Sequence, residues 1–185
     1  MEKLTLDTGL LIKAIEFKEG YESVLKICKW HADGKVLACV SNRLFNPDSV
    51  KMQDSQREKI RRLLEEYNIE IMGNLFRLGV SPLSGKDMMS GSSTDRTEQE
   101  INEFKSIVGI DPTQLSSRSV GSKLSNKIGD YDSLYEHFCK KRDVFLTFDG
   151  KDYFHKNHRS NYQSKLDLMI LHPEEYVERN PQHSR

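Results

Sequence analysis

The 185-residue sequence predicts an α/β fold, a three-layer α/β/α sandwich around a mostly parallel central sheet. Short apolar runs rich in β-branched and aromatic residues lack polar alternation, which is typical of strands covered on both faces. These runs alternate along the chain with segments whose apolar residues recur at helical spacing. Such alternation specifies parallel strands joined by right-handed helical crossovers.

Five apolar runs are the predicted strands. Turn residues bound several of them, such as Asp33-Gly34 before the second run and Asp149-Gly150 after the fourth. The predicted strands are residues 4–6, 35–41, 69–72, 144–147 and 168–171. Residues 107–110 form a weaker candidate for a further strand.

Helical spacing of apolar residues predicts most of the connections between these strands. Residues 21–30 fit either a helix or an extended piece packed on the sheet. Pro173 is expected at the first position of a short helix, the position that suits a proline best. The predicted helices are residues 10–15, 51–67, 98–104, about three turns that follow Asp132, and 173–177.

Length and composition indicate one domain spanning residues 1–180, with residues 181–185 as a C-terminal tail. Two Ser-rich stretches, near residues 81–99 and 111–127, cannot bury enough apolar surface to order themselves, so we expect mobile loops there. No apolar run approaches the ~20 residues that span a bilayer. We therefore expect a cytoplasmic protein without a membrane partner.

Charge and cysteine usage narrow the possible partners and metal sites of the protein. The formal net charge is zero, so a nucleic-acid partner has to be held by a local basic patch rather than by overall charge. The three cysteines lack Cys-x-x-Cys spacing and are expected to be reduced, mostly buried thiols. His155 and His158 are expected to be solvated or to cap a helix rather than to bind zinc.

Several acids stand where parallel strands end. Asp7, Asp48 and Asp149 each follow a predicted strand, while Asp130 and Asp132 stand at the start of a predicted helix. Because parallel strands place their carboxyl ends on one edge of the sheet, these acids can meet there. Clustered carboxylates repel one another unless a cation neutralises them, and hard oxygen ligands suit Mg²⁺ or Mn²⁺. The alternative is structural, with Asp7 or Thr8 capping a helix and Asp48 in a turn.

Three motifs carry a resemblance to a known family. They are Leu-Thr-Leu-Asp7-Thr, Asp130-x-Asp132-x-Leu134-x-x-His137 and Arg142-Asp143-Val-Phe-Leu-Thr147-x-Asp149. Together they resemble the PIN-domain nucleases, a metal-dependent ribonuclease family that includes many bacterial toxins. The resemblance extends in element order from residue 4 to about residue 178. It implies that Asp7 and Asp149 are metal ligands, together with Asp130, Asp132 or both.

The chain departs from the family pattern in two places. The usual second acid is a glutamate in a helix after the second strand, and here Asp48 is the nearest candidate, with Glu65 as the alternative. The Ser-rich insertions between residues 81 and 127 are longer than those of the compact toxins. The resemblance therefore leaves open whether the chain is a toxin or has another role.

The resemblance implies a Mg²⁺- or Mn²⁺-dependent endoribonuclease, a hydrolase that cleaves phosphodiester bonds of single-stranded nucleic acid, with RNA favoured over DNA. It leaves open a homodimer and an inhibitory partner protein. An acidic pocket repels a polyanion, so bordering cations are expected to contact the phosphates, and these are Arg43, Arg118 and Lys127. The expected catalytic residues are Asp7, Asp48, Asp130, Asp132 and Asp149, and the expected metal ligands are Asp7, Asp130, Asp132 and Asp149.

Two other classes of function compete with the nuclease. One is a PIN-like module that has lost catalysis and only binds RNA or a partner protein, and the number of candidate acids argues against it. The other is a phosphatase of the haloacid-dehalogenase type, which also begins with a strand and an aspartate. That chemistry requires a second aspartate two residues later, where this chain has Gly9.

Overall fold

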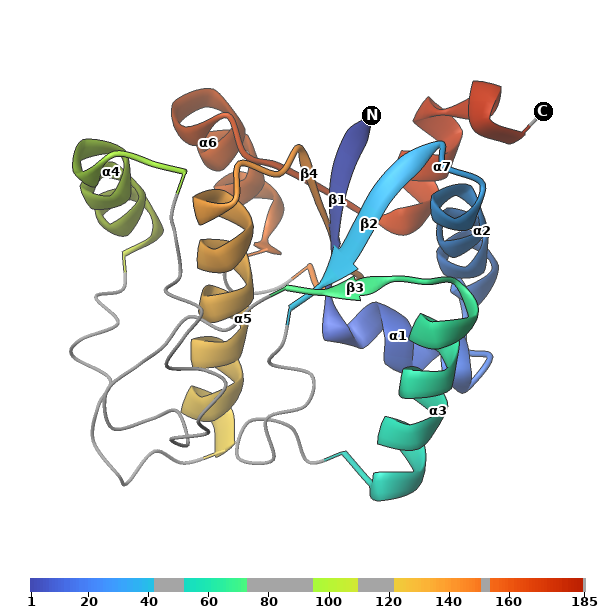
Figure 1. Ribbon diagram of the computed structural model, residues 1–185. Helices are drawn as coiled ribbons and strands as arrows, with labels where there is room; N and C mark the ends of the chain where they lie inside the picture. The colour runs from blue at the N-terminus through green and yellow to red at the C-terminus, as the bar shows by residue number, and fades with distance from the viewer. Residues whose placement is uncertain (42–51, 73–94, 110–121, 151–153, 185) are drawn as a thin grey trace.

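The computed structural model describes residues 1–41, 52–72, 95–109, 122–150 and 154–184 of the chain (Figure 1). Within these residues a five-stranded sheet forms in the order β3-β2-β1-β4-β5, and every neighbouring pair is parallel. The strands are β1 (Glu2–Leu6), β2 (Val36–Val40), β3 (Glu70–Ile71), β4 (Val144–Leu146) and β5 (Met169–Leu171). The predicted α/β class, the parallel sheet and all five predicted strands are confirmed.

Helices cover both faces of the sheet. One face is packed by α1 (Thr8–Ile15), α2 (Tyr21–Ala32), α3 (Asp54–Glu66) and α7 (Pro173–Arg179). The other face is packed by α4 (Glu98–Val108), α5 (Ser122–Cys139) and α6 (Lys156–Leu166). Figure 1 shows the two groups on opposite sides of β1 and β2. The arrangement is compatible with the predicted three layers.

Each helical layer has its own hydrophobic core, because alternate residues of a strand point to opposite faces. Leu4 and Leu6 of β1 belong to the first core, with α1, α2, α3 and α7. Phe145 of β4 belongs to the second core, with α4, α5 and α6. Thr5 lies between Leu4 and Leu6 and points to the second face, where it meets α5. The central strands are therefore covered on both sides, as their unbroken apolar sequence predicted.

The structure corrects two sequence predictions and decides a third that was left open. The strand expected at residues 107–110 is wrong, because Phe104 and Val108 are buried one helical turn apart and α4 continues to Val108. Residues 21–30 are helical, since Val24, Ile27 and Cys28 present one buried face of α2. The helix that was expected to follow Asp132 begins at Ser122.

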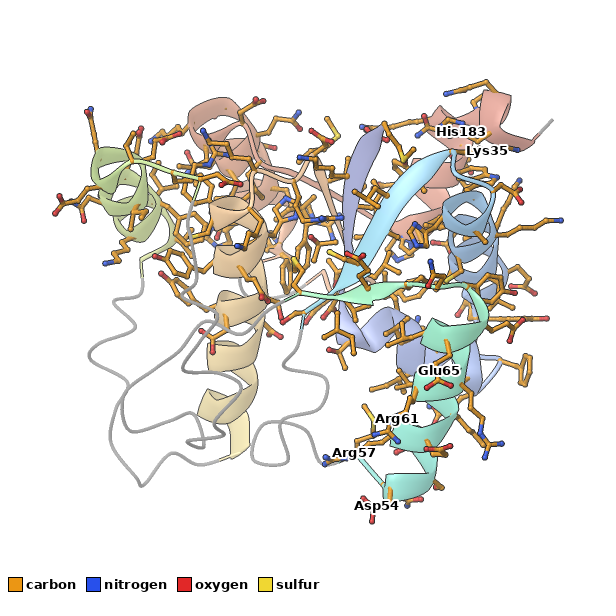
Figure 2. All side chains as sticks on the ribbon, viewed as in Figure 1. Lys35, Asp54, Arg57, Arg61, Glu65 and His183 are labelled. Carbon is orange, nitrogen blue, oxygen red and sulfur yellow. The ribbon has the colours of Figure 1, made fainter. Side chains whose placement is uncertain are left out.

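The expected Ser-rich loops and tail also differ in part. Thr97 accepts a hydrogen bond from the backbone of Glu100 and begins α4, so residues 95–99 are structured. Residues 122–127 belong to α5, and the remainder of both stretches lies outside the described residues. Residues 181–184 form a 3₁₀ turn rather than a tail. Lys35 Nζ donates to the carbonyl of His183 at 2.6 Å, and Figure 2 shows these two residues together.

Other expectations about single residues are confirmed. Cys28, Cys39 and Cys139 are buried thiols. Pro173 takes the first turn of α7, and His155 caps α6 by accepting a hydrogen bond from the amide of Asn157. Within the described residues no helix is both long and apolar enough to cross a membrane.

The strand order creates a switch point beside the central strand. From β1 the chain moves outward to β2 and β3, and it then returns to the other side of β1 to form β4 and β5. The connections that leave β1 and β4 therefore run in opposite directions. In open α/β sheets ligands bind at such a point, beyond the carboxyl ends of the strands. In this chain those ends are followed by Asp7 and Thr147.

Candidate functional site

Three side chains stand in a row just beyond the ends of the central strands. Leu6 of β1 is in register with Val40 of β2 and with Leu146 of β4, so the next residue of each strand is Asp7, Ser41 and Thr147 respectively. Asp7 continues the ladder, since its amide donates to the carbonyl of Leu146 at 3.0 Å. Neighbouring strands lie about 4.8 Å apart, so these residues are close neighbours at the carboxyl edge.

The side chain of Asp7 is held by Thr147 at the start of α1. Asp7 occupies the N-cap position of α1, but its side chain makes no capping hydrogen bond. Instead Oδ2 of Asp7 accepts a hydrogen bond from Oγ1 of Thr147 at 2.8 Å. Burial raises the pKa of Asp7, the hydrogen bond from Thr147 opposes this, and the charge of Asp149 raises it further. The backbone amides of Thr8 and Gly9, at the start of α1, also lower the pKa. The charged form of the Asp7 carboxylate is therefore less favourable than that of a solvated aspartate, and a nearby cation would stabilise it.

Asp149 is joined to Asp7 through the same threonine. The amide of Asp149 donates to Oγ1 of Thr147 at 3.0 Å, so one hydroxyl connects the Asp7 carboxylate to the backbone of Asp149. The carbonyl of Asp149 accepts a hydrogen bond from Nη2 of Arg159 at 2.8 Å, and Nε of Arg159 donates to the carbonyl of Phe154 at 2.7 Å. Arg159 thus fixes the turn after β4 and places its positive charge beside Asp149.

A second acidic pair lies on α5. Asp132 and Glu136 are one helical turn apart, and the charge of Asp132 contributes to the environment of Glu136. Glu136 is 4% exposed, and the hydroxyl of Ser41 donates a hydrogen bond to its carboxylate. Burial is the main reason that the pKa of Glu136 rises to about 7. Its Oε1 accepts no hydrogen bond from any described residue.

His137 fastens α5 across the central strand. Its Nδ1 hydrogen-bonds with Oγ1 of Thr5 at 2.8 Å, and the imidazole is fully buried. Burial lowers the pKa of His137 to about 3, and the nearby charges of Arg142 and Arg96 lower it further. The side chain is therefore a neutral anchor at physiological pH. It sets the height of α5 on the sheet and so brings Glu136 to Ser41.

The buried polar groups of the described chain are concentrated at this place. Six polar or charged residues are buried there, all of them on α5 or within or just beyond β1, β2 and β4. They are Thr5, Ser41, Ser133, Glu136, His137 and Thr147. Burying polar groups destabilises a fold unless they are paired, so a local concentration indicates a functional site rather than a packing requirement.

The structure brings some of the predicted site residues together and separates others. Asp7 and Asp149 lie at one edge of the sheet, linked through Thr147. Asp130 and Asp132 are half-buried in the interior of α5 rather than at its start, and residues two apart on a helix point to different sides. Of these two, Asp132 is the residue whose negative charge raises the pKa of Glu136.

Several other predicted residues do not contribute a described side chain. Arg43, Asp48 and Arg118 lie outside the described residues, and Lys127 is placed only as part of the α5 backbone. Glu65, the alternative second acid, is exposed on α3, whose buried face packs in the first core (Figure 2). Glu65 is therefore on the wrong side of the sheet to join the acids that face α5.

The sequence reasoning missed Glu136, Ser41 and the linking role of Thr147. The available signal was a glutamate within the otherwise buried face that Leu134, His137 and Phe138 form on α5. Among the described residues, no three acidic, histidine or cysteine side chains are arranged to hold one metal ion. The charge of Asp149 raises the pKa of Asp7, and the charge of Asp132 raises the pKa of Glu136, so the four acids make two electrostatically interacting pairs. No protein-family model, curated protein or solved structure matches the chain.

Proposed function

We propose that this protein is a Mg²⁺- or Mn²⁺-dependent nuclease that hydrolyses phosphodiester bonds of single-stranded nucleic acid, with RNA as the favoured substrate. The observation that carries the proposal is the linkage of Asp7 and Asp149 through Thr147 at the switch point of a parallel sheet. That position is where such sheets bind ligands. Further support comes from the sequence motifs around Asp7, Asp132 and Asp149, which resemble those of PIN-domain nucleases.

The donor groups fit a hard divalent cation. Mg²⁺ keeps several waters and is held through one or two carboxylates plus substrate phosphates. The Asp7–Asp149 pair offers two carboxylates whose mutual repulsion a cation would relieve, because the charge of Asp149 raises the pKa of Asp7. When bound, such an ion activates water and stabilises the charge that develops on phosphate oxygens.

The chain's own residues prepare this site before any substrate arrives. Thr147 orients the Asp7 carboxylate, and Arg159 fixes the turn that carries Asp149. We propose Asp132 rather than Asp130 as the acid that α5 contributes to this edge of the sheet. The charge of Asp132 raises the pKa of Glu136, which accepts a hydrogen bond from Ser41 just beyond β2. We propose that the positively charged side chains of Arg43, Arg118 and Lys127 border the acidic site and contact the substrate phosphates.

The test is cleavage of a labelled single-stranded RNA and of a DNA of matching sequence, with Mn²⁺ or with EDTA. Wild-type protein is expected to cleave RNA only with metal. Asp7→Asn and Asp149→Asn should lower the rate at least about 100-fold, the scale of a lost electrostatic contact to a transition state. The matched control is Asp167→Asn, because Asp167 is exposed in a left-handed turn that asparagine also tolerates.

Two outcomes would count against the proposal. Equal cleavage by the wild type and by Asp7→Asn would indicate a contaminating nuclease. No cleavage of either substrate with Mg²⁺ or Mn²⁺ would favour the alternative, a PIN-like module that binds RNA or a partner protein without cleaving it.

A further inference from the structure

We infer that Asp132 and Glu136 hold a divalent cation of their own, separate from the position offered by Asp7 and Asp149. The inference rests on the proposed function, because it describes a second metal position of the same nuclease site. It assigns Glu136 as a ligand, although no motif in the sequence marks this residue.

The placement of the pair is the first step. Residues four apart on a helix lie one above the other on the same side, so Asp132 and Glu136 can face one point. Two contacts fix the height of α5 on the sheet: His137 with Thr5 in the middle of β1, and Glu136 with Ser41 just beyond β2. Asp132 is one turn nearer the N-terminus of α5, and α5 runs against the strand direction (Figure 1). Asp132 therefore lies farther toward the carboxyl edge.

The unsatisfied oxygen of Glu136 is the second step. Ser41 donates to the carboxylate, but the buried Oε1 accepts no hydrogen bond from any described residue. An unpaired buried carboxylate oxygen is costly, and a neighbouring acid makes it costlier. The positive charges of Lys140 and Arg142 lower the pKa of Glu136, but burial raises it by more. A cation bound to Oε1 would satisfy this oxygen and relieve the repulsion from Asp132.

The division into two pairs is the third step. No three donors within the described chain converge on one ion, whereas each pair supplies the one or two carboxylates that suffice for Mg²⁺. Both pairs border the row formed by Ser41, Asp7 and Thr147. Two cations at one edge are a known arrangement for phosphodiester chemistry, since they act on the attacking and the leaving oxygen.

The test counts bound Mn²⁺ on the full-length protein without nucleic acid, from the loss of the free-ion signal in electron paramagnetic resonance. The wild type should bind two ions, and Glu136→Gln should bind one. Asp7→Asn should also bind one, and combining it with Glu136→Gln should leave none. Glu65→Gln is the matched control, because Glu65 is an exposed glutamate on the opposite side of the sheet, and it should retain both ions.

Each other result decides against the inference. Two ions bound by Glu136→Gln would overturn a separate position while leaving the proposed nuclease intact. A wild type that binds only one ion, which both Glu136→Gln and Asp7→Asn fail to bind, would do the same. A wild type that binds no Mn²⁺ would overturn both. If circular dichroism shows that Glu136→Gln does not fold, Asp132→Asn tests the same position, because Asp132 is only half-buried and the same loss of one ion is expected.

Discussion

Two adjacent residues of α5 have pKa values displaced in opposite directions by the same cause. Burial raises the pKa of Glu136 to about 7 and lowers the pKa of His137 to about 3. Desolvation penalises whichever form is charged, so both side chains favour their neutral forms in the fold. These two side chains therefore make the stability of the fold depend on pH. Glu136 destabilises the fold at neutral pH, where it tends to be charged, and His137 destabilises it at acid pH for the same reason.

Glu136→Gln should remove one pH-dependent component of folding stability in metal-free buffer. The folded pKa of about 7 lies above the ordinary 4.5, so wild-type stability is lost as pH rises from 4.5 through 7. The loss is about 3 kcal/mol at most, at ~1.4 kcal/mol per pKa unit. Urea unfolding in EDTA at pH 5 and pH 8 should show a smaller loss in the variant.

The control for this experiment is Glu65→Gln, which makes the same change at an exposed position. It should follow the wild type at both pH values. If Glu136→Gln also follows the wild type, Glu136 is charged in the fold over this range and its burial has another source of compensation.

Among the elements, the segment between α1 and α2 supports the turn after β4. Gly20 begins α2 with a positive φ of 85°, and a Cβ there would lie 2.7 Å from Cε1 of Phe148 and would also meet Glu174. Phe148 stands between Thr147 and Asp149, and Lys13 lies over its ring at 3.8 Å. Because Gly20 has no side chain, α1 and α2 can both approach Phe148, which stands between Thr147 and Asp149.

Gly20→Ala should destabilise the protein more than Gly34→Ala. Both residues have positive φ, so both variants should lose roughly 1–2 kcal/mol from left-handed backbone strain. A Cβ at Gly34 meets nothing within 4 Å, whereas at Gly20 it collides with Phe148, which should add roughly 1–3 kcal/mol. Urea unfolding of the two variants measures the difference, and equal losses would mean that Phe148 moves aside freely.

At the scale of the whole molecule, the described residues form two hydrophobic cores that share one sheet. Trp30, the single tryptophan, lies in the first core with Tyr176, while Phe154 and Phe145 stack in the second. The strands β1 and β4 contribute side chains to both cores. Loss of either core should therefore remove the packing that holds the sheet, and the described chain is expected to unfold as one unit.

Phe154→Leu, a change in the second core, should lower the urea midpoint reported by Trp30 fluorescence from the first. The expected loss is roughly 1–2 kcal/mol for removing part of a buried aromatic ring. Far-UV circular dichroism should give the same midpoint. Phe17→Leu is the control, since Phe17 is exposed and should leave the midpoint unchanged. A Trp30 transition unaffected by Phe154→Leu would show that the cores unfold independently.

The sequence alone determined the five strands and the edge of the sheet at which they end. Unbroken apolar runs predicted strands buried on both faces, because only helices on both sides can cover them. Acids after such strands had to share an edge, because parallel strands end together, and this placed Asp7 near Asp149. These features depend on local pattern and on topology rules, and both can be read from one chain.

Only the tertiary structure decided which groups touch. The order of strands sets Thr147 beside Asp7 across 140 residues of sequence, and this pairing depends on long-range packing that no local pattern encodes. The start of α5 lies among Ser, Asn and Gly residues of weak helical propensity, so the local sequence did not place the start of the helix at Ser122. The contact between His137 and Thr5 sets the height of α5 on the sheet. At that height Glu136, a residue type that is usually exposed, is buried and bonded to Ser41.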